Sequence, residues 1–188
     1  MKKIMFLAMM AFISNNIFSQ SFVSTPNGLK DSLNLNNEYL VLKFDGRSAN
    51  QLYDLTNKFC QKFYVSPKTA LQSDIKDEYI KIQTYEKKFI MLVKGIVGEK
   101  YYGNIIYSAN FTFKDGKVKF EVSEVKMEIW DNDQEVFYRS PGGIYWCIFK
   151  KNGTPKGDLY IQYQDYFNKY ISNYVYFVNN YKKENDKW

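Results

Sequence analysis

The chain has 188 residues, a formal net charge of +6 and no histidine. Its length suits one domain with a substantial hydrophobic core. The absence of histidine excludes Ser-His-Asp and Cys-His nucleophile systems and the common zinc sites. An enzymatic function would therefore have to rest on carboxylates, lysine or tyrosine.

Residues 1–19 have the parts of a secretory signal peptide. Lys2 and Lys3 precede an apolar run at 4–13, and Ser19 is the small residue before the expected cleavage between Ser19 and Gln20. This run is shorter than the roughly 20 residues of a membrane-spanning helix. A buried N-terminal helix is the alternative, which the flanking lysines disfavour. The signal peptide predicts an exported protein, periplasmic or extracellular, and we expect no membrane span. Because no cysteine lies near the cleavage site, we also expect no lipid anchor.

The next segment, 20–37, is rich in Ser, Asn and Asp, and we expect it to be a flexible lead-in. Alternating apolar residues predict a first strand at 38–44. Ser48 followed by Gln51 is a capping-box pattern, which predicts that a helix begins there. Apolar residues at helical spacing give this helix one buried face, and Ser66-Pro67 ends or kinks it.

Alternation and turn residues predict further strands at 79–85, 89–97, 102–113 and 118–127. Between the last two, Asp115-Gly116 predicts a tight hairpin, because these residues readily adopt the positive φ angles of such turns. The alternation of the last strand slips by one residue at Ser123-Glu124, which predicts a bulge or bend.

The C-terminal part combines an irregular insert at 128–157, which contains an acidic patch at 131–135, with a second helix predicted at 158–183. Residues 38–188 are therefore expected to form one α+β domain of β-α-β-β-β-β-α order. Its antiparallel sheet should carry both helices on one face. The other face should show polar and aromatic side chains: Tyr39, Lys43, Lys81, Gln83, Tyr85, Ser108, Asn110, Thr112, Lys119 and Glu121.

Three segments carry a resemblance to a known family. They read EYLVLKFDGRSANQLYDLTNKFC, EYIKIQTY and YSANFTFKDGKVKFEVSEVKM, and they lie between Glu38 and Met127. With the leading signal peptide, they resemble a family of secreted bacterial domains of unknown function with a TATA-box-binding-protein-like (TBP-like) fold. The resemblance implies a fold but no catalytic residue. Since DNA-binding versions need apolar wedges and a basic sheet, the mixed charges here predict no nucleic-acid partner.

Seventeen tyrosines stand out in the composition, and seven of them lie in the second predicted helix. Aromatic residues at helical spacing usually form a core, yet so many on one helix cannot all share one stripe. Tyrosine also suits interfaces and carbohydrate stacking. We therefore consider this helix the best candidate for a partner surface, formed by Tyr160, Tyr163, Tyr166, Tyr170, Tyr174 and Tyr176.

Cys60 and Cys147 are the two cysteines of the chain. In an oxidising compartment they are candidates for a disulfide, and the alternative is two separate buried thiols. A reactive thiol would have no histidine to activate it.

The sequence shows no catalytic signature and predicts no metal or cofactor. We expect an exported, non-enzymatic binding domain whose partner is an envelope protein, a glycan or a second copy of itself. One alternative is a structural or regulatory subunit of an envelope assembly. Another is a polysaccharide hydrolase that uses carboxylates such as Glu121, Glu124 and Glu128, which would need two acids facing each other across a cleft.

Overall fold

The computed structural model describes residues 20–94, 100–129, 135–137, 148–150 and 152–181. The predicted signal peptide with Ser19, most of the acidic patch and Cys147 lie outside these ranges. Within them, no helix is long and apolar enough to span a bilayer.

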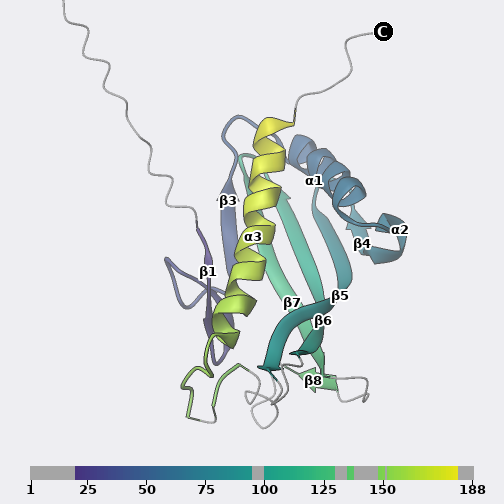
Figure 1. Ribbon diagram of the computed structural model, residues 1–188. Helices are drawn as coiled ribbons and strands as arrows, with labels where there is room; N and C mark the ends of the chain where they lie inside the picture. Colours follow the sequence, from purple (N-terminus) through teal and green to yellow (C-terminus); the bar gives the residue numbers. More distant parts are fainter. Residues whose placement is uncertain (1–19, 95–99, 130–134, 138–147, 151, 182–188) are drawn as a thin grey trace, which may run out of the picture.

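A six-stranded antiparallel sheet forms one layer and two long helices form the other (Figure 1). The strand order is β3-β7-β6-β5-β4, and β8 pairs with β7. The helices are α1 (Ala49–Phe63) and α3 (Leu159–Asn180), and the short α2 (Pro67–Ala70) leads into β4. The strands of the sheet are β3 (Tyr39–Lys43), β4 (Leu71–Ile75), β5 (Tyr79–Lys94), β6 (Lys100–Lys114), β7 (Lys117–Ile129) and β8 (Glu135–Phe137). This arrangement confirms the predicted α+β class with helices on one face.

Helix α1 begins at the predicted capping box. Gln51 N donates to Ser48 Oγ at 3.3 Å, and Ser48 N donates to Gln51 Oε1 at 3.0 Å. A further orphan amide of the first turn, Ala49 N, donates to Asp115 Oδ1 at 2.8 Å. Asp115 belongs to the β6–β7 turn, so the hairpin itself caps the helix.

The β6–β7 hairpin turn is confirmed at Asp115-Gly116, since Lys114 and Lys117 pair across it. Only Gly116 has positive φ there, at 72°. Its amide donates to Arg47 O at 2.8 Å, and its carbonyl accepts from Phe44 N at 2.8 Å. The turn is thereby tied to the segment between β3 and α1.

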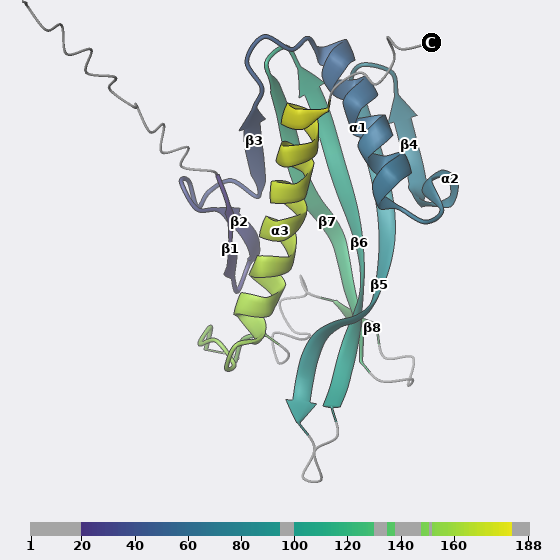
Figure 2. The same cartoon turned by 45° about the horizontal axis from the view of Figure 1, so that its top comes forward.

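Two strand predictions are corrected by the structure. The segments predicted as separate strands at 79–85 and 89–97 belong to the single strand β5, as far as Lys94 (Figure 2). The apparent break between them is a register shift between Glu86 and Ile90, where Lys88 has a φ of 55°. Strand β4 escaped prediction because, as an edge strand with mostly exposed residues, it has no buried alternation.

The prediction of a flexible lead-in at 20–37 is wrong. The segment contains a hairpin of β1 (Phe22–Thr25) and β2 (Gly28–Asp31), which lies beside α3 in both views (Figures 1 and 2). Phe22 is fully buried, and its ring lies 6.0 Å from that of Phe120. Phe22 N donates to Asn168 Oδ1 at 2.7 Å, and Asn168 Nδ2 donates back to Phe22 O at 3.0 Å. The side-chain amide of Asn168 on α3 therefore pairs with the backbone of Phe22 as a neighbouring strand would.

Three of the six tyrosines of α3 belong to the core, which corrects the prediction of a partner surface at these positions. Tyr163, Tyr170 and Tyr174 are at most 2% exposed, because the stripe they share faces the sheet. Tyr160 and Tyr166 are half-buried, and only Tyr176 of the six is exposed, at 71%.

Burial of these tyrosines costs little because their hydroxyls find partners inside the protein. Tyr170 bonds with Tyr64 at 2.9 Å, and Tyr166 bonds with Tyr107 at 2.9 Å. Desolvation raises the pKa of Tyr170 and of Tyr107 well above the ordinary value, and it raises that of Tyr64 to about 12. All these hydroxyls therefore stay neutral across the physiological range.

We predict that Tyr174→Phe lowers the free energy of unfolding by about 1 kcal/mol. Thr56 Oγ1 donates to Leu52 O at 2.7 Å, so it must accept from the Tyr174 hydroxyl, 2.7 Å away. The variant leaves this buried acceptor unpaired. Urea unfolding measures the change, and Tyr176→Phe is the matched control, expected within about 0.5 kcal/mol of the wild type. Equal stability of the two variants would show that the buried hydroxyl contributes nothing.

Candidate functional site

The sheet face opposite the helices, here called the open face, carries the best-organised polar groups of the protein. Strand alternation places the apolar residues of β3, β5, β6 and β7 in the core and their neighbours on this face. The prediction of a one-sided sheet is confirmed. The ten residues predicted for the open face all lie on it, although Ser108 and Asn110 are themselves buried.

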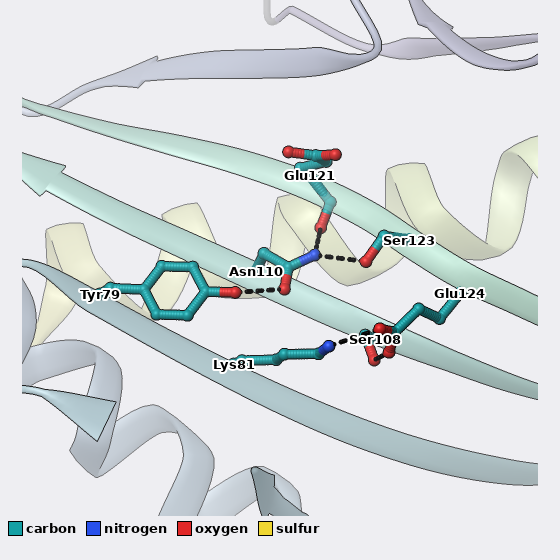
Figure 3. A network of polar contacts seen from close by, with 7 residues as sticks. All are labelled: Tyr79, Lys81, Ser108, Asn110, Glu121, Ser123 and Glu124. Atoms are coloured by element: carbon teal, nitrogen blue, oxygen red, sulfur yellow. Dashed lines mark hydrogen bonds and ion pairs between the residues drawn. The ribbon is translucent and has the colours of Figure 1, made fainter. Parts of the chain in front are cut away.

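Asn110 on β6 is the centre of a hydrogen-bond chain that crosses three strands (Figure 3). Tyr79 Oη on β5 donates to Asn110 Oδ1 at 2.7 Å. Asn110 Nδ2 donates to Ser123 Oγ on β7 at 2.7 Å and to Glu121 O at 3.4 Å. Because both ends of the amide are used, the hydroxyls of Tyr79 and Ser123 are held in fixed positions.

Glu124 is the centre of a second group of contacts on the same face (Figure 3). Lys81 Nζ donates to Glu124 Oε1 at 2.6 Å, and Ser108 Oγ donates to Glu124 Oε2 at 2.6 Å. Lys81 comes from β5 and Ser108 from β6, so Glu124 also links three strands. The Lys81 hydrogen bond, followed by that of Ser108, lowers the pKa of the Glu124 carboxyl. The group is therefore ionised at neutral pH.

A β-bulge aims Glu124 across the sheet. Ile106 pairs with Lys126 and Ser108 with Ser123, so two residues of β7 lie opposite one residue of β6. Glu124 takes a φ of 53°, which costs a non-glycine residue about 1–2 kcal/mol. The predicted slip at Ser123-Glu124 is thus confirmed as a bulge. Sequence reasoning found its position but missed its effect, because both side-chain partners lie on other strands.

Two adjoining depressions follow these contacts across the open face. The first, of about 240 Å³, is lined by Tyr79, Lys81, Asn110, Thr112, Lys119, Glu121 and Ser123. The second, of about 340 Å³, is lined by Tyr39, Val41, Thr112, Lys114, Lys117 and Lys119. Thr112 and Lys119 line both, so together the depressions offer a continuous path toward β3 for an extended ligand.

Lys119 is fixed between the two depressions. Its Nζ lies 3.5 Å from Glu121 Oε2 and 4.7 Å from the centre of the Tyr39 ring. Glu121 and Glu124 are therefore each paired with a lysine. The two acids do not face each other across a cleft, which is the arrangement that the carboxylate hydrolase would need.

Two larger cavities lie on the helical side of the described structure. One of about 520 Å³ between α1, α2 and β4 includes Cys60, and a groove of about 670 Å³ between α1 and α3 includes Tyr176. Burial raises the pKa of the Cys60 thiol to about 12, so it is a poor nucleophile. Its pairing with Cys147 stays a prediction. Over the described ranges, no group of three or more Cys, Asp and Glu side chains could hold a metal ion.

Comparisons with known proteins support the fold alone. No family model and no curated protein matches the sequence. The chain is similar to a DUF4468 family protein from Bacteroides ovatus ATCC 8483, with 11% identity, a TM-score of 0.52 and coverage of 79% of this chain and 88% of that chain. It is also similar to a TBP-like protein from Parabacteroides distasonis ATCC 8503, with 11% identity, a TM-score of 0.51 and coverage of 77% and 92%. The fold is therefore TBP-like, as the resemblance implied, and function must be argued from the site.

We predict that Glu124→Gln lowers the free energy of unfolding at pH 7 by less than about 1 kcal/mol, since the Glu124 side chain is 49% exposed and screened by solvent. The folded-state pKa is depressed, so the ion pair stabilises the protein fully above the unfolded-state value, near 4.5. The contribution is lost as the pH falls through the folded-state pKa. The stability difference between wild type and variant should therefore shrink below about pH 4.5.

Chemical denaturation between pH 3 and 7 measures this effect, with Lys81→Gln and the double variant completing a mutant cycle. Additive effects at pH 7, or a difference that persists unchanged at pH 3, would contradict the assigned ion pair.

Proposed function

We propose that this protein is an exported, non-enzymatic binding domain whose ligand is a glycan lying along the open face. The observation that carries the proposal is the Tyr79–Asn110–Ser123 chain, which fixes polar groups on three adjacent strands. Groups held by a rigid sheet lose little conformational freedom on binding, so their contacts contribute more to affinity.

The chemistry of the open face suits a hydroxyl-rich chain. Tyr79 Oη keeps acceptor capacity, Ser123 Oγ can still donate, and Thr112 adds a hydroxyl where the two depressions meet. Tyr39 and Tyr79 bring ring surface beside these polar groups, and tyrosine rings pack well against sugar rings while their hydroxyls stay hydrated. A mixture of ring surface, hydroxyls and amides matches the alternating apolar and polar surface of a sugar chain.

The ionisation of Glu124 supports binding rather than hydrolysis. A glycosidase needs one carboxyl that holds its proton at working pH, and Lys81 and Ser108 hold Glu124 in the charged form. Burial of three of the six candidate tyrosines on α3 also reduces the aromatic surface that this helix could offer a protein partner.

Export is supported by the N-terminal pattern, and the contacts of Gln20 are compatible with it. Gln20 Oε1 accepts from Val41 N at 2.9 Å, and Gln20 Nε2 donates to Asp31 Oδ2 at 3.1 Å. Cleavage after Ser19 would leave these contacts intact.

The experiment is a glycan-array screen with the chain from Gln20 onward, followed by calorimetry with soluble polysaccharides. Thr112→Tyr should weaken binding by roughly tenfold or more, because the ring fills the junction of the two depressions. Ser172→Tyr, on the exposed surface of α3, is the matched control and should bind like the wild type. No reducing ends should accumulate during incubation.

Three outcomes would overturn this proposal: wild-type protein that binds no polysaccharide, a Thr112→Tyr variant that binds as well as the wild type, or release of reducing ends. Thermal unfolding of both tyrosine variants shows whether a loss of binding reflects a loss of folding.

A further inference from the structure

Three lysines face one another in a row at one end of the open face. Lys43 on β3 pairs in register with Lys117 on β7, and Lys117 pairs in register with Lys114 on β6. All three are exposed, and each alternates with a core residue, so all three side chains are on the open face. Neighbouring strands are about 4.8 Å apart, which puts the three backbone positions within about 10 Å. We call these residues the lysine row.

The lysine row is unfavourable for the free protein, because like charges directly opposite each other in a sheet repel. Within the part of the chain that the structure describes, none of the three is in an ion pair. Asp115, the acid of the adjacent turn, turns to the helical side and caps Ala49 N. The row is therefore a concentrated positive charge that the fold tolerates without neutralising it.

The positive charge does not extend over the whole open face. Glu121 lies four residues along β7 from Lys117, about 14 Å away, and Glu124 follows it. A lipid surface or a nucleic-acid backbone presents negative charge continuously and would meet these two acids. A chain with separate acidic groups and hydroxyls between them avoids that conflict.

Because the row consists of lysine and not arginine, it suits a ligand whose carboxylates are carried on a flexible chain. Arginine reads planar, bidentate groups in a fixed geometry, whereas lysine is a mobile point charge that tolerates variable positions. The depression that Lys114 and Lys117 of the row help to line also has Tyr39, Val41 and Thr112 in its lining. It can thus contact a sugar ring while lysines on its rim reach the ring's acidic group.

We propose that the ligand of the open face is an acidic polysaccharide, whose uronic-acid carboxylates lie over the lysine row and whose hydroxyls reach Thr112, Ser123 and Tyr79. This inference rests on the proposed function and adds the chemical class of the glycan. Part of the stability that the repulsion costs is regained when the ligand neutralises the row.

The test uses polygalacturonate and its methyl ester, a pair of polymers that differ in charge but not in backbone. Wild-type protein should bind the acid form, bind the ester at least tenfold more weakly, and lose affinity as salt rises. The triple variant Lys43→Gln, Lys114→Gln, Lys117→Gln should bind the acid form roughly tenfold or more weakly. The matched control changes the same net charge on the helical layer: Lys62→Gln, Lys68→Gln, Lys169→Gln, all exposed. It should retain affinity.

A second readout separates the lysine row from an ordinary solvated surface. Lys117→Gln removes the middle charge of the row, so at low salt it should raise Tm while weakening binding. An unchanged or lower Tm would contradict the repulsion on which the inference depends.

The outcomes distinguish the two proposals. Equal binding of acid and ester, blocked by Thr112→Tyr but not by the triple variant, would overturn the acidic class and leave the glycan site standing. Failure to bind either polymer or any arrayed glycan would overturn both. Tighter binding of anionic phospholipid vesicles or of single-stranded RNA than of polygalacturonate, lost in the triple variant, would assign the lysine row to a membrane or a nucleic acid instead.

Discussion

The register of β6 against β7 is the constraint on which both faces of this protein depend. It places Phe111 opposite Phe120 in the core, and one residue away it places Asn110 opposite Glu121 on the open face. A slip of one residue would exchange the two sets of side chains. The turn at Asp115-Gly116 fixes that register and also caps α1, so the same short hairpin aligns the sheet and seats the helix. Helical packing and polar surface are thus two consequences of one pairing.

The bulge at Glu124 shows how that register is interrupted to useful effect. The extra residue changes which side chains of β7 face the core, and it turns a carboxylate toward Lys81 and Ser108. Its positive φ costs free energy that the two short hydrogen bonds offset. The lysine row has a similar character, since its mutual repulsion is not relieved by any contact in the described protein. Unlike the cost of the bulge, the repulsion within the row is not offset inside the described fold, which is consistent with the proposed role of the row in binding.

Elements specified by neighbouring residues could be predicted from sequence. The capping box of Ser48 and Gln51, the Asp115-Gly116 turn and the bulge all depend on local spacing, and the structure has each of them. The β1–β2 hairpin could not be predicted, because Phe22 pairs with Asn168, 146 residues further along the chain. The tyrosines of α3 were misassigned for the same reason. Whether a tyrosine is buried depends on partners such as Tyr64 and Thr56, which the helical period of α3 does not reveal.

The residues of the open face could be predicted from sequence, but their hydrogen bonds and local charge could not, because these depend on neighbours across the strands. Lysines at 43, 114 and 117 look scattered in the sequence, and scattered lysines are usually solvated. The antiparallel register brings them into one row, so their charges add up to a local positive potential. Similarity to TBP-like structures at 11% identity extends to the fold alone. Further along β7, Glu121 and Glu124 interrupt the positive charge of the open face, which favours the proposed ligand, a chain with spaced negative charges and hydroxyls between them.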